Sequence, residues 1–229
     1  MPPEHDFAKI YYAGGPWGGA ISAIAITRDN DFIAFAGTAV GLYRTIFGQD
    51  EQPSSWIRLQ EAPLGILALS VSPPYEIDHL LVAGTCSGIE ISQDGGDTWQ
   101  PARMPAANTT ILCLCFSPQF AQDGILLAGT LEDGVLYSED RGKTWGNRSF
   151  GLFDPAVYCL GISPHFAQDG IIFAGTETAL YYTYNHARAW RQIEFPPETT
   201  PVLSLAVSPG YASDQTVLAG TENQGVFRS

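Results

Sequence analysis

Large and small apolar residues alternate along five short segments of the chain, which follow one another at intervals of about 45 residues. These segments begin near Ile21, Ile66, Ile111, Val157 and Val202. An alternation of period two predicts β-strands whose two faces are packed differently. The third and fifth positions of every segment hold only Ala, Ser, Cys or Gly. We therefore expect neighbouring elements to press closely on that face, as they do where innermost strands converge around an axis.

Each segment opens a unit that carries the same further landmarks. A turn follows, often beginning with Ser-Pro, and ends at an aspartate five positions before an Ala-Gly-Thr sequence in a second strand. We expect these aspartates to accept hydrogen bonds within their own turns rather than to form a ring around a metal. The glycine predicts close approach by a neighbouring element. A third strand and a more polar fourth strand complete the unit. The aspartates are Asp31, Asp78, Asp123, Asp169 and Asp214.

Four short strands in each of five consecutive units predict an all-β fold, a five-bladed β-propeller of four-stranded antiparallel blades. We treat residues 1–229 as a single domain, because repeated units share one continuous core. The fifth unit reaches only its third strand, whereas the apolar segment Phe7–Tyr12 lies about one strand ahead of Ile21. We expect this N-terminal strand, residues 7–12, to complete the last blade and close the ring, which would pair an otherwise exposed edge.

A second repeated pattern, Ser-x-Asp-x-Gly-x-Thr-Trp, follows the third strand of two units, and a degenerate copy spans 183–190. It predicts a tight hairpin loop, because the Asp can accept hydrogen bonds from nearby backbone amides and Gly tolerates a positive φ. The Trp brings a large apolar ring back over the edge of the sheet. The structural residues that we expect in these loops are Ser92, Asp94, Gly96, Thr98, Trp99, Ser138, Asp140, Gly142, Thr144, Trp145, Asn185 and Trp190.

These loops resemble those of Asp-box proteins, also called bacterial neuraminidase repeat proteins, and the resemblance covers nearly the whole chain. It implies a sialidase-like propeller with the Asp boxes remote from the ligand face. Similar repeats occur in sialidases, sortilin-type receptors, xyloglucan-degrading enzymes and the photosystem II assembly propeller, so the resemblance does not decide activity. Sialidases have six blades, an arginine cluster and a Tyr–Glu pair, and their Arg-Ile-Pro-type opening is missing here. We therefore expect no enzyme.

Charge and composition narrow the classes of partner. The chain has 11 basic and 24 acidic residues, a formal net charge of −13, which argues against nucleic acid and anionic membranes. No apolar run approaches membrane-spanning length and no secretory signal is visible at the N-terminus, so we expect a cytoplasmic protein. The four cysteines and four histidines show no metal-binding spacing. We expect no metal and no cofactor.

A ligand face is expected opposite the Asp boxes, on the loops between second and third strands and between consecutive units. Acidic and aromatic residues on these loops suit a cationic or peptide partner, or a sugar stacked on a ring. Our leading hypothesis is a non-catalytic module that binds another protein. The alternative is a lectin-like propeller that binds a glycan, and a glycoside hydrolase is the least favoured. The candidate ligand-face residues are Trp17, Glu132, Asp133, Phe153, Asp154, Glu177, Glu222 and Asn223.

Overall fold

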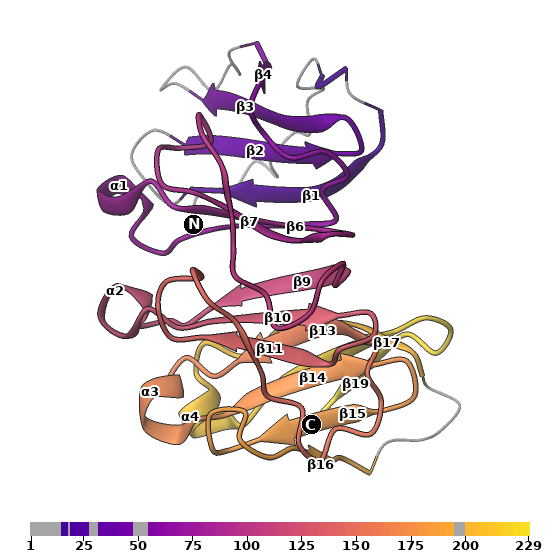
Figure 1. Ribbon diagram of the computed structural model, residues 1–229. Coiled ribbons are helices and arrows are strands. Elements are labelled where there is room, and N and C mark those ends of the chain that lie inside the picture. The colour runs from indigo at the N-terminus through magenta and orange to yellow at the C-terminus, as the bar shows by residue number, and fades with distance from the viewer. Residues whose placement is uncertain (1–14, 18, 28–31, 48–54, 195–199) are drawn as a thin grey trace, which may run out of the picture.

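The computed structural model describes residues 15–17, 19–27, 32–47, 55–194 and 200–229, which form five antiparallel β-sheets in the order of the sequence (Figure 1). The first sheet contains β1 (Ile21–Ile26), β2 (Phe32–Thr38), β3 (Gly41–Phe47) and β4 (Ile57–Leu59). The second contains β5 (Ala68–Val71), β6 (Leu81–Thr85), β7 (Gly88–Ser92) and β8 (Gln100–Pro101). The third contains β9 (Ile111–Phe116), β10 (Leu126–Thr130), β11 (Val135–Ser138) and β12 (Gly146–Asn147). The fourth contains β13 (Val157–Ile162), β14 (Ile172–Thr176), β15 (Leu180–Thr183) and β16 (Arg191–Gln192), and the fifth contains β17 (Val202–Val207), β18 (Val217–Thr221) and β19 (Val226–Arg228).

The predicted all-β chain of repeated four-stranded units is confirmed for the first four sheets. The first strand of the second unit, which the sequence places near Ile66, spans Ala68–Val71. The amide of Ile66 donates instead to the carbonyl of Thr38 in the preceding sheet, at 3.3 Å. The fifth sheet has three strands within the described residues. The closing segment Phe7–Tyr12 lies outside them, so ring closure and the number of blades stay predictions.

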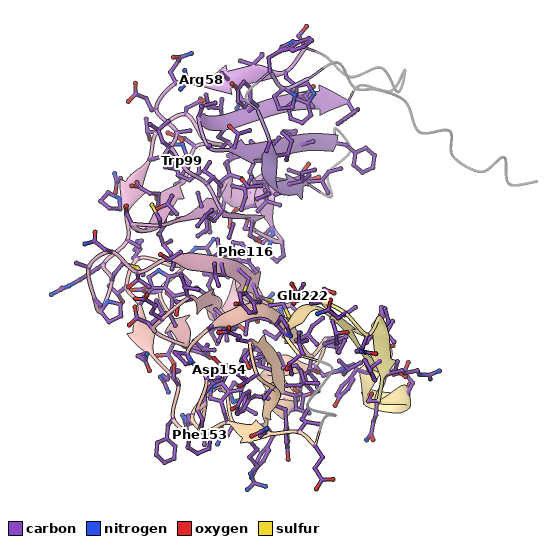
Figure 2. The ribbon with its side chains drawn as sticks, turned by 90° about the vertical axis from the view of Figure 1, so that its right-hand side faces the viewer. Arg58, Trp99, Phe116, Phe153, Asp154 and Glu222 are labelled. Atoms are coloured by element: carbon purple, nitrogen blue, oxygen red, sulfur yellow. The ribbon has the colours of Figure 1, made fainter. Side chains whose placement is uncertain are left out.

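Neighbouring sheets stack face to face, with buried apolar side chains between them. Leu42 of the first sheet packs with Leu81 of the second, and Val82 of the second packs with Leu126 of the third. The innermost strands β1, β5, β9, β13 and β17 lie side by side in that order. Figure 2 shows the sheets along an arc, with the first sheet at one end and the fifth sheet at the other.

The glycine of each Ala-Gly-Thr sequence lies where the next unit begins, as predicted. A Cβ atom on Gly37 would lie 2.6 Å from Cγ2 of Ile66, and one on Gly84 would lie 2.5 Å from Cγ2 of Ile111. We call this contact, between the glycine of one unit and the first residue of the next, the glycine junction. The other two junctions pair Gly129 with Val157 and Gly175 with Val202.

Each turn between the first and second strands of units two to five contains a four-residue helix that the sequence did not predict. The helices are α1 (Tyr75–Asp78), α2 (Phe120–Asp123), α3 (Phe166–Asp169) and α4 (Tyr211–Asp214). The Asp123 carboxylate accepts hydrogen bonds from Ser117 Oγ at 2.5 Å and from the amide of Ile125 at 2.9 Å. These bonds recur at Asp78, Asp169 and Asp214, which confirms the predicted turn cap in the four described turns. Asp31 lies outside the described residues.

The cysteines of the first strands occupy the small-residue positions against neighbouring sheets. Burial raises the pKa of the Cys115 and Cys159 thiols to about 12 and raises the pKa of Cys113 as well. Thiols with such pKa values stay protonated at neutral pH and are poor nucleophiles. Their surroundings therefore suit packing rather than redox chemistry.

Candidate functional site

The loops of the sheets gather on two opposite sides of the molecule. Helices α1 to α4 form a row on one side in Figure 1. The loops after the third strands lie on the same side, since the amide of Gly95 donates to His79 just after α1, and that of Arg141 to Gly124 just after α2. The remaining loops lie on the side that faces the viewer in Figure 2. The two sets of residues proposed from the sequence thus occupy opposite sides.

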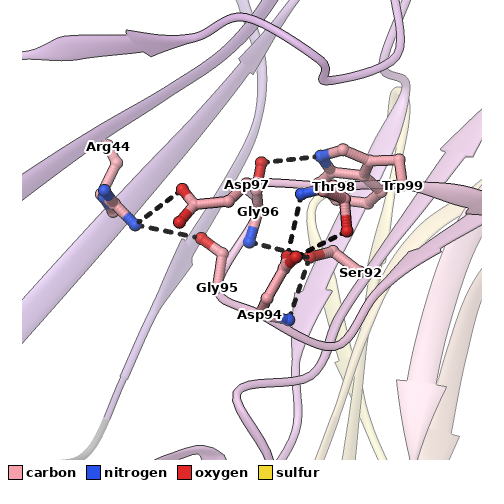
Figure 3. Close-up of polar contacts among 8 residues, drawn as sticks. All are labelled: Arg44, Ser92, Asp94, Gly95, Gly96, Asp97, Thr98 and Trp99. Carbon is pink, nitrogen blue, oxygen red and sulfur yellow. Dashed lines mark hydrogen bonds and ion pairs between the residues drawn. The ribbon is translucent and has the colours of Figure 1, made fainter.

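The first Ser-x-Asp-x-Gly-x-Thr-Trp loop is closed by its own side chains (Figure 3). The Asp94 carboxylate accepts hydrogen bonds from Ser92 Oγ at 2.7 Å and from the amide and hydroxyl of Thr98 at 2.9 and 2.5 Å. The amide of Gly96 donates to Ser92 Oγ at 2.8 Å, and Gly96 adopts a positive φ of 98°. The indole of Trp99 donates to the Gly96 carbonyl at 2.9 Å. Each polar side chain of the pattern therefore serves the loop itself.

The second loop repeats these bonds, and the degenerate third loop keeps part of them. Asp140 accepts from Ser138 at 2.9 Å and from the amide of Thr144 at 2.8 Å, and the Trp145 indole donates to Gly142 at 2.7 Å. In the third loop Asn185 takes the place of the aspartate and accepts from the Thr183 hydroxyl at 2.7 Å and the Ala189 amide at 3.0 Å. The Trp190 indole donates to Arg148 of the preceding sheet instead of its own loop, at 2.7 Å.

Arginines fasten these loops to neighbouring elements. Arg44 of β3 donates to the Gly95 carbonyl at 3.3 Å and lies 3.7 Å from the Asp97 carboxylate (Figure 3). Arg141 in the second loop pairs with Asp78 of α1 at 2.5 Å, and its guanidinium lies 4.6 Å from the centre of the Phe120 ring. Both contacts cross from one sheet to the next. We therefore regard this side of the molecule as structural.

The loop geometry predicts an acid-sensitive contribution to stability. Burial alone would raise the pKa of Asp94, but the hydrogen bonds from Thr98 and Ser92 outweigh it and lower the pKa from 3.8 to about 2. A carboxylate whose pKa is lower in the folded than in the unfolded state stabilises the fold at pH values above its unfolded-state pKa. For Asp94 this stabilisation is lost as the pH falls from 3.8 towards 2. We expect the free energy of unfolding, measured with urea at pH 5 down to pH 2, to fall less steeply in Asp94→Asn than in the wild type. An equal slope in both proteins would contradict this, and Glu76→Gln on α1 serves as the control for loss of an exposed carboxylate.

On the opposite side, two of the proposed ligand-face carboxylates are engaged in hydrogen bonds to neighbouring loops. Asp133 accepts the hydroxyl of Thr109 at 2.8 Å. Asp154 is buried and accepts the amide of Thr178 at 2.7 Å, its hydroxyl at 2.8 Å, and the amide of Ala156 at 3.1 Å. These bonds link the loop that enters the fourth sheet to the loop between its second and third strands. Both aspartates therefore shape the loops that carry the exposed residues.

The other proposed residues are exposed but do not form one group. Glu132, Glu177, Glu222 and Asn223 lie on the loops between second and third strands of the third, fourth and fifth sheets. Phe153 precedes β13, whereas Trp17 precedes β1 at the far end of the arc. The rings of Phe153 and Trp17 are both 87% exposed. Trp17 is thus separated from the acidic loops of the last two sheets.

Three of the acidic residues act electrostatically on Tyr158 in β13, and the amide of Glu177 donates to the carbonyl of Ala156, two residues before Tyr158, at 3.3 Å. Partial burial raises the pKa of Tyr158, and the nearby carboxylates of Glu177, Asp154 and Glu222 raise it further. The Tyr158 hydroxyl therefore stays protonated at neutral pH and can donate a hydrogen bond into an acidic surrounding. We call Tyr158, Glu177 and Glu222, supported by Asp154, the acidic rim. Figure 2 shows Asp154 and Glu222 on the side of these loops.

Tyr158 is the residue of this site that sequence reasoning missed. It occupies the second position of a first strand, where the other units have Ser22, Leu67, Leu112 and Leu203. The only polar aromatic residue at this position among the five units was therefore the sequence signal that could have indicated Tyr158. The acidic residues around it were proposed separately, and only the fold brings them together.

The inner surface of the arc forms an open apolar groove of about 500 Å³. Ile24 and Ile26 of β1, Val71 of β5 and Phe116 of β9 line it together with the Ser-Pro turns. None of the described residues that line it is charged. The groove therefore offers no partner for an ionic group.

Over residues 15–17, 19–27, 32–47, 55–194 and 200–229, no three His, Cys, Asp or Glu side chains are grouped so that they could hold a metal ion. Within this part of the chain, no helix is both long and apolar enough to span a bilayer.

No family model and no curated protein matches the chain by sequence. Among solved structures, an ancestral GH74 enzyme superposes with a TM-score of 0.73 at 19% identity, over 94% of this chain and 31% of its own. The extracellular domain of a hybrid two-component system from B. thetaiotaomicron gives 0.68 at 18% identity, over 91% and 26%. YCF48 bound to D1 peptide gives 0.60 at 15% identity, over 91% and 64%. This chain therefore spans less than two thirds of each, and the likeness establishes a β-propeller-type fold.

Proposed function

We propose that this chain is a non-catalytic, Asp-box propeller module that binds a basic segment of another protein through the acidic rim. The observation that carries the proposal is the set of backbone and side-chain bonds that hold the loop of Glu177 beside the start of β13, where the carboxylates of Glu177, Asp154 and Glu222 raise the pKa of Tyr158. Carboxylates attract lysine and arginine side chains, and the phenol supplies both a hydrogen-bond donor and an aromatic surface for a cation. The net charge of −13 adds long-range attraction for a basic partner.

The scaffold beneath the acidic rim supports recognition rather than turnover. Asp154 ties two loops together through hydrogen bonds of 2.7 to 3.1 Å, so Glu177 starts from an ordered backbone. Ordered loops lose little conformational entropy on binding. A structural neighbour, YCF48, is bound to a peptide in its own structure, which is compatible with peptide binding by this fold.

Fluorescence anisotropy with a labelled lysine-rich peptide tests the proposal. We expect Glu177→Gln/Glu222→Gln to weaken binding by about tenfold, since two charge-assisted contacts are lost. Glu76→Gln/Glu139→Gln removes the same charge from the opposite side and should leave affinity close to that of the wild type. A matched peptide with glutamine in place of lysine should not bind. The proposal fails if both double variants weaken binding equally, or if the wild type does not bind the lysine peptide.

A glycan is the second candidate, favoured by one specific observation. Phe153 is 87% exposed and directly precedes the buried Asp154, so an open aromatic face stands beside an anchored loop. An exposed ring can stack on a sugar, and one structural neighbour is a GH74 enzyme. A glycan array in which the wild type binds and Phe153→Ala does not would favour this function over peptide binding.

A further inference from the structure

The chain leaves one half of a glycine junction open at each end of the arc. Ile21, the first residue of unit one, is 40% exposed, whereas the equivalent residues of the other units are buried. At the other end, the described atoms nearest to a Cβ on Gly220 all belong to Ser204 of the same sheet. In the four internal junctions the equivalent glycine meets the first residue of the following unit. Within the described residues, Ile21 thus meets no glycine of a preceding unit, and no residue of a following unit is among the nearest neighbours of Gly220.

The outward face of the fifth sheet repeats the pattern of faces that are buried elsewhere. Leu218 pairs with Ala206 and Arg228, in the register in which Val82 pairs with Ser70 and Ile91. Val226 is 70% exposed and Leu218 is also exposed. The counterparts that the next sheet buries are Val82 and Ile89, Leu127 and Val135, and Phe173 and Leu180. The fifth sheet thus presents a stacking surface without its usual neighbour.

The outward face of the first sheet shows the complementary pattern. Ile24, which is 70% exposed, and Ile26, which is also exposed, lie on the side of β1 opposite to Ala23 and also form part of the wall of the inner groove. Their counterparts in the second sheet, Leu69 and Val71, are only partly accessible because the first sheet packs on them. Exposed apolar residues that lie together on one sheet face are a mark of an interaction surface.

We propose that a second copy of this chain covers these faces, with the fifth sheet of one copy stacked on the first sheet of the next. Ile21 of one copy would then fill the glycine junction at Gly220 of the other. The chain already forms this interface four times, and each end of the arc presents one side of it. The described residues of the first and fifth sheets lie apart (Figure 2), so in this proposal a separate copy, in place of the ring closure expected from the sequence, supplies the missing side. This association is head-to-tail, and it does not depend on the acidic rim.

Charge sets the conditions under which the copies associate. Each copy carries −13, so two copies repel one another at low ionic strength. Salt screens this repulsion and leaves the apolar contact intact. We expect self-association to increase with sodium chloride concentration, which is opposite to the salt dependence expected for a basic peptide at the acidic rim.

Sedimentation velocity on variants of the two ends tests the proposal. We expect the wild type to form dimers or larger species as concentration rises. Ile21→Asp damages only the first sheet's face and Val226→Asp only that of the fifth, and each should lower the association constant by about tenfold or more, because burying an unpaired carboxylate is unfavourable. Ile77→Asp changes an equally apolar, exposed side chain on α1 and should associate like the wild type. Circular dichroism confirms that each variant is folded, and Ile24→Asp replaces Ile21→Asp if that variant is not.

The decisive sample is an equal mixture of Ile21→Asp and Val226→Asp. The first variant keeps an intact fifth sheet and the second keeps an intact first sheet, so the mixture can form one undamaged interface and should yield a 1:1 heterodimer. A symmetric, self-complementary interface would not be restored by mixing. A wild type that stays monomeric at the highest concentration and salt, or a mixture that stays monomeric while the wild type associates, overturns the proposal.

Discussion

Replacing Trp145 with alanine should lower the free energy of unfolding by about 3–5 kcal/mol. The Trp145 ring is 6% exposed and packs between the second and third sheets. Its indole also donates to the Gly142 carbonyl at 2.7 Å, so the substitution removes a buried ring and a hydrogen bond that closes the loop. Urea unfolding followed by circular dichroism measures the loss.

Trp17→Ala is the matched control for this substitution. Trp17 is 87% exposed, and removal of an exposed side chain changes stability by about 0.5 kcal/mol or less. If Trp145→Ala were as mild as Trp17→Ala, the ring would not hold the two sheets together, and our account of the loop as structural would be wrong.

Gly129→Ala should destabilise the protein by about 1–3 kcal/mol through overpacking. The added Cβ would lie 2.5 Å from Cys113 Sγ and 2.8 Å from both Cγ1 and the carbonyl oxygen of Val157. The carbonyl oxygen belongs to the backbone at the start of β13, so it cannot turn aside as a flexible side chain can. Thermal unfolding and urea unfolding both report this change.

Gly146→Ala gives the corresponding control in the same sheet. No atom lies within 4 Å of a Cβ built on Gly146, so the substitution meets open space. We expect little change in the midpoint of unfolding. Equal destabilisation by the two substitutions would mean that loss of glycine itself, and not the contact with Val157, is responsible.

Local patterns predicted the parts of the fold that depend on local contacts. Alternation placed the strands, and the hydrogen bonds of Asp94 and Asp123 are made to residues only a few positions away. The close approach at Gly129 was also predicted, because the glycine of the Ala-Gly-Thr sequence recurs at a fixed offset in all five units.

The candidate site depended on contacts that no local pattern contains. Tyr158 lies in β13, whereas Glu177 and Glu222 lie on loops of the fourth and fifth sheets, so the effect of both carboxylates on Tyr158 depends on the stacking of the sheets. The short helices were missed because four residues are too few for a helical periodicity. The bond from the amide of Ile66 to the preceding sheet is a contact that alternation alone does not reveal.

The glycine junction also bears on how such a chain can change its length in evolution. Every junction takes its two halves from consecutive units, so no unit requires a side chain from a distant one. Duplication or deletion of a whole unit would recreate the same pair of glycine-junction surfaces at the new boundary. The junction itself therefore permits the copy number to vary one repeat at a time, whereas contacts particular to one pair of units, such as that of Arg141 with Asp78, would have to be replaced.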